Sequence, residues 1–284
     1  MKKKRNLITV LLFVIFLAGL SLLLYPSVSD YWNSLHQTRA IANYTEEVAV
    51  LDQELYQEMW DAAQSYNAAL AERRNTYTLS DEQMREYESL LDLSGLGIMG
   101  YIEIPEIDCS LPVYHGTEES VLQIAVGHIE WTSLPVGGEG THCVLSGHRG
   151  LPSAKLFTNL DKLEPGDVFL LRILDEVLTY EVDQILIVEP QDTSALQIVK
   201  GKDYCTLMTC TPYGVNTHRL LVRGHRIDNI EQAHSVRVTA DAVQIEPTLV
   251  APIVAIPILL LLLIALLLPK RQKHKYRGDA DEDV

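Results

Sequence analysis

A cysteine and an arginine in one stretch of the sequence have the types and spacing needed for acyl-transfer chemistry. A β-prone run ends at Cys210, Pro212 and Gly214 interrupt it, and a second β-prone run begins at Arg219. Because paired strands lie only ~5 Å apart, a strand-loop-strand unit would bring Arg219 back beside Cys210. A cation near a thiol favours the thiolate, which is the reactive form of cysteine.

A histidine follows another β-prone run, which covers residues 141–146 and leads into Gly147-His148-Arg149-Gly150. His148 is therefore expected where a strand ends. A thiolate nucleophile needs a general acid and base, and an imidazole can serve as both, while Arg219 could stabilise a developing oxyanion. The alternative is that Cys210 and His148 are structural, since a lone cysteine in a strand is usually a small core residue.

Three motifs occur in the order Leu-Ser-Gly-His-Arg-Gly (145–150), Thr-Leu-Met-Thr-Cys-Thr-Pro-Tyr-Gly (206–214) and Asn-Thr-His-Arg-Leu-Leu-Val-Arg-Gly (216–224). Together they closely resemble the sortases, and in particular the class C sortases that build pili. Further matching segments extend the resemblance over most of 97–227; they are 97–105, 111–116, 127–128, 132–138 and 150–157. The resemblance implies that Cys210 is the catalytic cysteine, His148 the catalytic histidine and Arg219 the catalytic arginine.

Two apolar runs near the ends of the chain predict membrane-spanning helices. The run 7–24 follows four basic residues and would span ~27 Å as a helix, and the run 249–268 is followed by a basic segment. Positive flanks tend to stay cytoplasmic, so we expect a two-pass protein of the cell membrane with both termini in the cytoplasm and an extracellular catalytic domain. A cleaved secretory signal is the alternative for the first run, because 27–29 resembles a cleavage site.

The net charge is −15, and basic residues concentrated at the two ends leave the part between them still more acidic. An acidic surface argues against a nucleic-acid partner, which would need a basic face. It is consistent with an exported domain that stands off from an anionic membrane.

The other cysteines, Cys109, Cys143 and Cys205, form no Cys-x-x-Cys motif. Cys205 lies an odd number of residues from Cys210, so on a regular strand the two side chains face opposite sides. Cys143 could approach Cys205, and the choice there is between a disulfide and two buried thiols. A domain of this size can build its own core, so we favour buried thiols.

Apolar residues recur every three or four positions between residues 44 and 70, which predicts one amphipathic helix that packs on the main domain. A coiled-coil role is the alternative. Residues 75–96 are predicted as a loop with a short helix through Tyr87 as the alternative. Class C sortases have a lid here, commonly with Asp-Pro and an aromatic residue over the cysteine. This sequence has no Asp-Pro, so Asp81, Glu82 and Tyr77 are the remaining lid candidates.

From residue 97 onward, short β-prone runs alternate with glycine and proline. Seven or eight such strands predict a mostly β fold with a closed barrel, and the resemblance specifies the sortase barrel with short helices at 119–124 and 153–160. The predicted organisation is a basic start and membrane segment or signal anchor (1–29), a helical region and lid (30–96), the catalytic barrel (97–230), a linker (231–247), a membrane helix (248–268) and a cytoplasmic tail (269–284).

No cofactor is expected. His128, His142 and His225 could form a zinc site with a cysteine, but they lack the short paired spacings of structural zinc sites. Arg149 and Arg223 are interpreted as structural or rim charges.

The sequence thus predicts a membrane-anchored cysteine transpeptidase. By resemblance, it cleaves an L-P-x-T-G-like sorting signal between threonine and glycine, passes the acyl group to a pilin lysine and so joins pilin subunits by isopeptide bonds at a Gram-positive cell surface. One alternative is an enzyme that anchors proteins to the wall precursor or only hydrolyses them. The other is an inactive scaffold that binds pilins. The predicted second membrane span argues against the first alternative, and retention of Cys210, His148 and Arg219 argues against the second.

Overall fold

The computed structural model describes residues 2–73 and 77–229. Residues up to 27 belong to one compact unit and residues from 28 onward to another, and the fold below is that of the second unit. The predicted linker (231–247), second membrane helix (248–268) and tail (269–284) lie outside the described residues. Within these, one helical segment, Thr9–Ala49, is long and apolar enough to cross a membrane, with a mean hydropathy of 2.3 over its best window.

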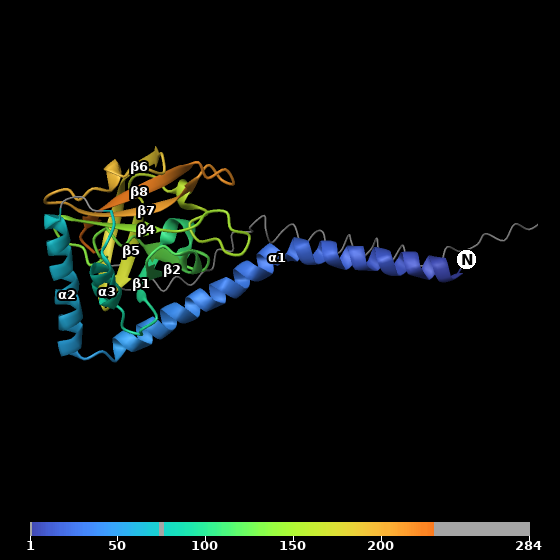
Figure 1. Ribbon diagram of the computed structural model, residues 1–284, viewed down its shortest axis with the longest axis horizontal. Helices are drawn as coiled ribbons and strands as arrows, with labels where there is room; N and C mark the ends of the chain where they lie inside the picture. The colour runs from blue at the N-terminus through green and yellow to red at the C-terminus, as the bar shows by residue number, and fades with distance from the viewer. Residues whose placement is uncertain (1, 74–76, 230–284) are drawn as a thin grey trace, which may run out of the picture. The chain divides into compact units, whose positions relative to one another are not determined.

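Eight strands close into a barrel in the order β1-β2-β3-β4-β7-β8-β6-β5 (Figure 1). Their bounds are β1 Ile98–Ile104, β2 Cys109–His115, β3 Val126–His128, β4 Thr141–Ser146, β5 Val168–Ile173, β6 Glu176–Val188, β7 Asp203–Thr211 and β8 His218–Ile227. Neighbours are antiparallel except β2 with β3 and β4 with β7, which are parallel. The predicted closed barrel is therefore confirmed. Strand β3 was not predicted, because three residues that include a glycine carry no visible alternation.

Apolar side chains fill the barrel interior, since successive residues of a strand point to opposite sides. Met99, Ile102, Phe157, Phe169 and Tyr180 are fully buried in this core. A second, smaller cluster lies apart from it and consists of Ile129, Val144, Leu196 and Leu221. In β7 the two clusters alternate along the strand: Leu207 belongs to the core, and Met208 packs against the second cluster.

Residues 44–70 belong to two helices, rather than to the single predicted one: α1 spans Lys2–Ala49 and α2 spans Gln53–Glu72. The prediction of one continuous helix from 44 to 70 was wrong, because Asp52 caps a new helix by accepting a hydrogen bond from Leu55 N at 2.8 Å. The side-chain amide of Asn67 then ties α2 to the barrel domain by bonding both backbone groups of Leu134, at 2.7 and 3.0 Å.

The second half of α1 is bonded to the barrel domain. Asn33 donates to Ser153 O at 2.8 Å, and the Asp30 carboxylate accepts from Lys155 N at 2.9 Å. Further along, the buried Tyr44 hydroxyl donates to Met99 O at 2.9 Å and accepts from Leu174 N at 2.7 Å. This part of the helix is therefore an integral part of the fold.

Nine residues of the predicted loop at 75–96 are helical, as in the alternative prediction: α3 spans Asp81–Ser89 and begins with a capping box of Ser80 and Gln83. Tyr87, named in the alternative prediction, is almost fully buried.

The shorter helices are η1 Pro105–Ile107, α4 Glu119–Leu122, η2 Leu160–Lys162 and η3 Ser194–Leu196. The predicted helix at 119–124 thus forms over four residues. The helix predicted at 153–160 does not: Leu156 has a φ of +40°, which an α-helix excludes, and turns lead into η2 instead.

Candidate active site

Cys210 and Arg219 are direct partners across the antiparallel ladder of β7 and β8. Residues facing each other in such a ladder have Cβ atoms ~5 Å apart, so the thiol and the guanidinium stem leave the sheet side by side. Both side chains are partly exposed. Arg219 Nη1 donates to the carbonyl of its neighbour His218 at 3.2 Å, which restricts where the guanidinium can point.

His148 follows β4, which runs parallel to β7 with Ser146 opposite Met208. Two more bonds continue this pairing: Gly147 N donates to Met208 O at 3.0 Å, and Thr209 Oγ1 donates to Gly147 O at 2.7 Å. His148 lies two residues after Ser146, and Cys210 lies two residues after Met208. The parallel register therefore brings His148 alongside Cys210, on the side of β7 away from Arg219.

The imidazole of His148 is 28% exposed, and its Nε2 lies 3.8 Å from Glu119 Oε2 at the start of α4. Glu119 is itself held by Gln123, which donates to its other carboxylate oxygen at 3.0 Å. Glu119 is 72% exposed, so this contact lies at the surface of the site.

The other cysteines differ from Cys210 in their environment. Cys205 is fully buried in the barrel core, directly opposite Cys143 of β4, and burial raises its pKa well above the ordinary value. Burial also raises the pKa of Cys109, to about 12. All four cysteines are free thiols in this structure. Cys210 and Cys205 thus leave β7 on opposite faces, and only the face of Cys210 is accessible.

The second apolar cluster borders this accessible face. Met208, two residues before Cys210, packs against it together with Trp131 and Val188. Beyond the cluster, His142 Nε2 bonds Thr206 Oγ1 at 2.7 Å, and Thr206 lies four residues before Cys210, or about 13 Å along the strand. The four residues of the cluster are at most 7% exposed, so they form a small buried core on the outer side of β4 and β7.

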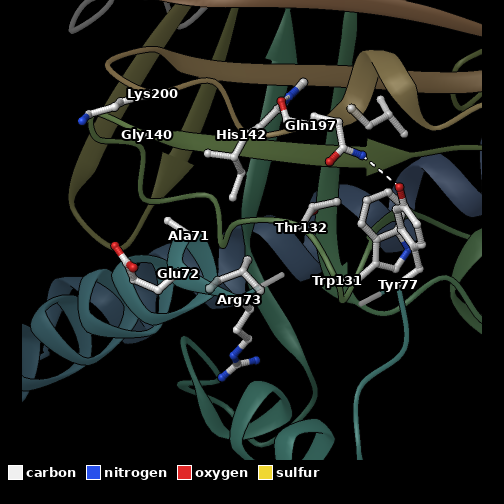
Figure 2. A pocket seen from close by; sticks show the side chains of 13 residues that line it. Ala71, Glu72, Arg73, Tyr77, Trp131, Thr132, Gly140, His142, Gln197 and Lys200 are labelled. Carbon is white, nitrogen blue, oxygen red and sulfur yellow. Dashed lines mark hydrogen bonds between the residues drawn. The ribbon is translucent and has the colours of Figure 1, made fainter. Parts of the chain in front are cut away.

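A cavity of about 400 Å³ lies beside this cluster, with Leu196 and Trp131 in its lining. Figure 2 shows the side chains around it, with the rings of Tyr77 and Trp131 together and Gln197 bonded to Tyr77. The two ring centroids are 5.0 Å apart in an edge-to-face arrangement, and Gln197 Nε2 donates to the Tyr77 hydroxyl at 3.1 Å. The cavity thus has an aromatic wall as well as polar groups such as His142.

The three lid candidates lie in two different environments in this structure. Tyr77 contacts the cavity wall just described, through Trp131 and Gln197. Asp81 and Glu82 are exposed in the first turn of α3, where acids are favoured by the helix dipole. A role for any of them over Cys210 remains a prediction.

Arg149 was interpreted as a structural or rim charge from the sequence, and its contacts are those of a structural charge close to the candidate site. Its side chain is only 10% exposed, and its guanidinium forms an ion pair with Asp161 of η2. It also approaches Thr211, the residue after Cys210. The sequence signal was its adjacency to His148, which says nothing about contacts made by residues 62 positions away.

In the described ranges 2–73 and 77–229, no three side chains of the histidine, cysteine and acidic types are grouped as metal ligands. His128 and His142 are instead bonded to protein groups: His128 to Tyr87 and the Ser133 carbonyl, and His142 to the Gln197 carbonyl and Thr206.

Comparisons with known proteins agree with this geometry. The sortase domain family matches residues 102–227. Sortase D of Bacillus subtilis is 34% identical over 131 residues, which are 45% of this chain and 63% of that protein, so the chain spans less than two thirds of this curated relative. Sortase C1 of Streptococcus agalactiae is 52% identical, with a TM-score of 0.66, and covers 68% of this chain and 100% of the solved one.

Sortase C of Clostridium perfringens, solved with the C-terminal cell wall sorting motif, is 45% identical, with a TM-score of 0.60; the match covers 68% of this chain and 100% of that one. A closed barrel that brings a cysteine, an arginine and a histidine together defines a candidate cysteine acyl-transfer site. The chain belongs to the sortase family of cysteine transpeptidases, and the solved relatives just described place it with the class C members.

Proposed function

We propose that this chain is a pilus-assembling transpeptidase that acts on an L-P-x-T-G-like sorting signal and transfers it to a lysine of a pilin subunit. The observation that carries the proposal is the pairing of Cys210 with Arg219 on β7 and β8, with His148 just past the end of β4, the strand on the other side of β7. Acyl transfer requires a nucleophile, a proton carrier and an oxyanion stabiliser, and these residue types supply all three.

In the first half-reaction, the Cys210 thiolate attacks the carbonyl carbon of the threonine in the sorting signal. The negative charge that develops on the carbonyl oxygen is stabilised by the Arg219 guanidinium. The intermediate then collapses: the C–N bond to glycine breaks, protonated His148 gives its proton to the leaving amine, and a thioester remains on Cys210.

In the second half-reaction, a lysine amine attacks the thioester carbonyl. His148, now neutral, accepts the proton that the amine releases, and Arg219 stabilises the second oxyanion. Breaking of the C–S bond returns the thiolate of Cys210 and leaves an isopeptide bond between the two pilin subunits. His148 ends the cycle protonated, so the enzyme returns to its starting state.

The partly exposed side chain of Met208, two residues before Cys210 on the same face of β7, supports a substrate with apolar residues. Leucine and proline of the sorting signal would lie near Met208, while the threonine carbonyl reaches Cys210. The relative from Clostridium perfringens was solved with a cell wall sorting motif, which fits this class of substrate.

We also propose that the enzyme acts at the outer face of the cell membrane, held there by α1 and by the predicted helix at 248–268. The apolar segment within Thr9–Ala49 supports the first span. Acceptor and donor would then both be presented close to the membrane in which the enzyme is anchored.

The test uses the full chain in detergent or in lipid, incubated with a sorting peptide. Mass spectrometry should find a thioester on Cys210 that retains the peptide through threonine, together with release of the glycine-led fragment. Addition of a pilin-derived lysine peptide should then give the isopeptide product. Efficient transfer only to an oligoglycine amine would indicate a wall-anchoring enzyme, and hydrolysis alone would indicate a protease; absence of any adduct would refute the enzymatic proposal.

A further inference from the structure

We infer that Arg149 is a positioning residue that fixes the imidazole of His148 relative to the thiol of Cys210. This inference rests on the proposed catalytic roles of those two residues. Arg149 follows His148 directly, and its guanidinium extends to the chain that leaves Cys210, so one side chain joins the two catalytic segments beyond the end of their strands.

The backbone pairing of β4 and β7 ends just before the site. The last paired residues are Ser146 and Met208, and two further bonds follow them, from Gly147 N to Met208 O and from Thr209 Oγ1 to Gly147 O. His148 and Cys210 therefore lie where the ladder no longer sets the distance between the two chains. The contact of Arg149 Nη1 with Thr211 Oγ1, at 3.5 Å, is the next link between them, one residue past each catalytic group.

Arg149 also contacts two further parts of the chain, η2 and the loop between β7 and β8. Its Nη2 bonds the carboxylate of Asp161 in η2, and its guanidinium carbon lies 5.9 Å from the ring centroid of Tyr213, in the loop between β7 and β8. Cation–ring contacts at this range are attractive. The guanidinium thus contacts two residues of the peptide segment that follows Cys210, and η2 as well.

The backbone around His148 leaves little room for adjustment. A Cβ on Gly147 would lie 2.7 Å from Phe157 Cδ2, and a Cβ on Gly150, whose φ is +74°, would lie 2.8 Å from Tyr213 Cε2. In addition, Phe157 N donates to His148 O at 3.1 Å. The segment is packed on both flanks, so a change in the Arg149 contacts would be transmitted to His148 rather than absorbed.

Lysine cannot replace arginine here. The side chain is 10% exposed, and a planar guanidinium can bond Asp161 and Thr211 while its face meets Tyr213. An ammonium is a point charge that keeps the pairing with Asp161 and loses the link to the β7–β8 side. Arg149→Lys therefore retains the positive charge and removes the contacts with Thr211 and Tyr213.

The experiment compares the full-length wild-type enzyme with Arg149→Lys on two substrates. One is the sorting peptide, whose amine leaving group needs a proton from His148; the other is the same acyl group as an activated ester, whose leaving group does not. We expect kcat on the peptide to fall about tenfold or more with KM changed less than about threefold. The rate on the ester should fall less than about threefold, because Cys210 and Arg219 are untouched.

Arg223→Lys is the matched control. Arg223 also pairs with an aspartate, at 2.9 Å to Asp183, and lies over a tyrosine ring, 4.2 Å from the centroid of Tyr204. We expect it to lower thermal stability without separating the two substrates. Equal losses on peptide and ester in Arg149→Lys, or unchanged kcat on both, would overturn the inference and leave Arg149 with a purely structural role.

A second readout does not depend on activity. In a His148→Cys background, a thiol oxidant such as diamide can join position 148 to Cys210, taking up the two electrons and two protons that the thiols release. Adding Arg149→Lys should slow formation of this disulfide at least about threefold, as followed by peptide mapping. An unchanged rate of disulfide formation would contradict the inference about Arg149. Absence of transferase activity in the wild-type chain would refute only the proposed function, so the two failures can be told apart.

Discussion

Cys210 and Arg219 face each other as a direct pair across β7 and β8, while Cys205, on the same strand as Cys210, faces Gly224 and the barrel core. One strand thus presents one thiol to solvent beside a cation and another to an apolar interior. This difference separates a chemical role from a packing role among residues of the same type.

Replacement of Cys210 by alanine should abolish both cleavage and transfer, because no thioester can form. Cys205→Ala should leave the chemistry within about twofold of wild type and cost on the order of 1 kcal/mol in stability through the small cavity it leaves. Peptide cleavage followed by chromatography and denaturant unfolding would measure the two effects. Activity that survived in Cys210→Ala but was lost in Cys205→Ala would reverse the assignment of the nucleophile.

Arg219→Lys should lower kcat by on the order of 10²–10³, although the charge is kept. A guanidinium can hold two acceptors in one plane, and loss of one oxyanion donor typically costs that much. Steady-state kinetics on the sorting peptide would show it, with circular dichroism to establish folding. Turnover near that of wild type would reduce Arg219 to a general electrostatic role.

Tyr87→Phe should destabilise the fold by about 1–3 kcal/mol, because the buried hydroxyl bonds His128 Nδ1 at 2.9 Å and accepts from Gly116 N at 3.0 Å. Its removal leaves His128 Nδ1 and Gly116 N without this bond, the first of them in a buried site. Tyr77→Phe is the control, since that hydroxyl is partly exposed and should cost less than about 0.5 kcal/mol. Urea unfolding would compare the two; equal effects would contradict the burial argument.

Tyr77→Ala should speed modification of Cys210 by a small thiol reagent less than about tenfold. The ring is 43% exposed and packs on Trp131, so any cover that this segment gives the thiol is loosely held. The rates would be compared at one pH in a background where the other cysteines are replaced by alanine. A much larger acceleration would mean that the segment forms a tight lid, as in the enzymes that carry Asp-Pro and an aromatic residue there.

Acid should weaken the fold through His142, whose pKa burial lowers from the ordinary value of 6.5, with Arg223 adding to the effect and the Gln197 carbonyl and Asp183 opposing it. The neutral ring donates from Nδ1 to Gln197 O and accepts at Nε2 from Thr206. Below about pH 6.5 the unfolded chain binds a proton that the folded chain does not, so stability falls as the pH drops toward the lowered pKa. His142→Gln should flatten this slope in urea midpoints measured from pH 7.5 to 5, and an unchanged slope would exclude His142 as the cause.

Most strands of the barrel and the pairing that joins Cys210 to Arg219 could be predicted, because alternation and glycine or proline breaks are local signals. Strand β3 could not, since its three residues, 126–128, form a strand only through pairing with β2 and β4. The break between α1 and α2 depends on one capping side chain, Asp52, within an otherwise continuous helical pattern. The helical spacing of apolar residues continues across that break, so the sequence predicted a single helix.

Residues of the candidate site could be predicted where they lie in recognisable sequence motifs. They could not be predicted where their place in the site depends on contacts with distant residues. Cys210, His148 and Arg219 lie in motifs that resemble those of a family. Arg149 gains its position from Asp161, Thr211 and Tyr213, which are 12 to 64 residues away and carry no pattern linking them to it. Long-range partners of this kind are visible only when the fold is known.

The hydroxyl of Tyr44 bonds Met99 O and Leu174 N, at the point where the ladder between β1 and β5 would continue past Tyr101 and Arg172. A side chain from α1 thus serves as one rung of the seam that closes the barrel. During synthesis from the N-terminus, this rung exists before either strand that it will join, and β5 emerges more than a hundred residues later. The residue that bridges β1 and β5 is therefore synthesised before either strand. A fragment that begins after residue 44 would have to close its barrel without these two hydrogen bonds, leaving Met99 O and Leu174 N without the Tyr44 hydroxyl.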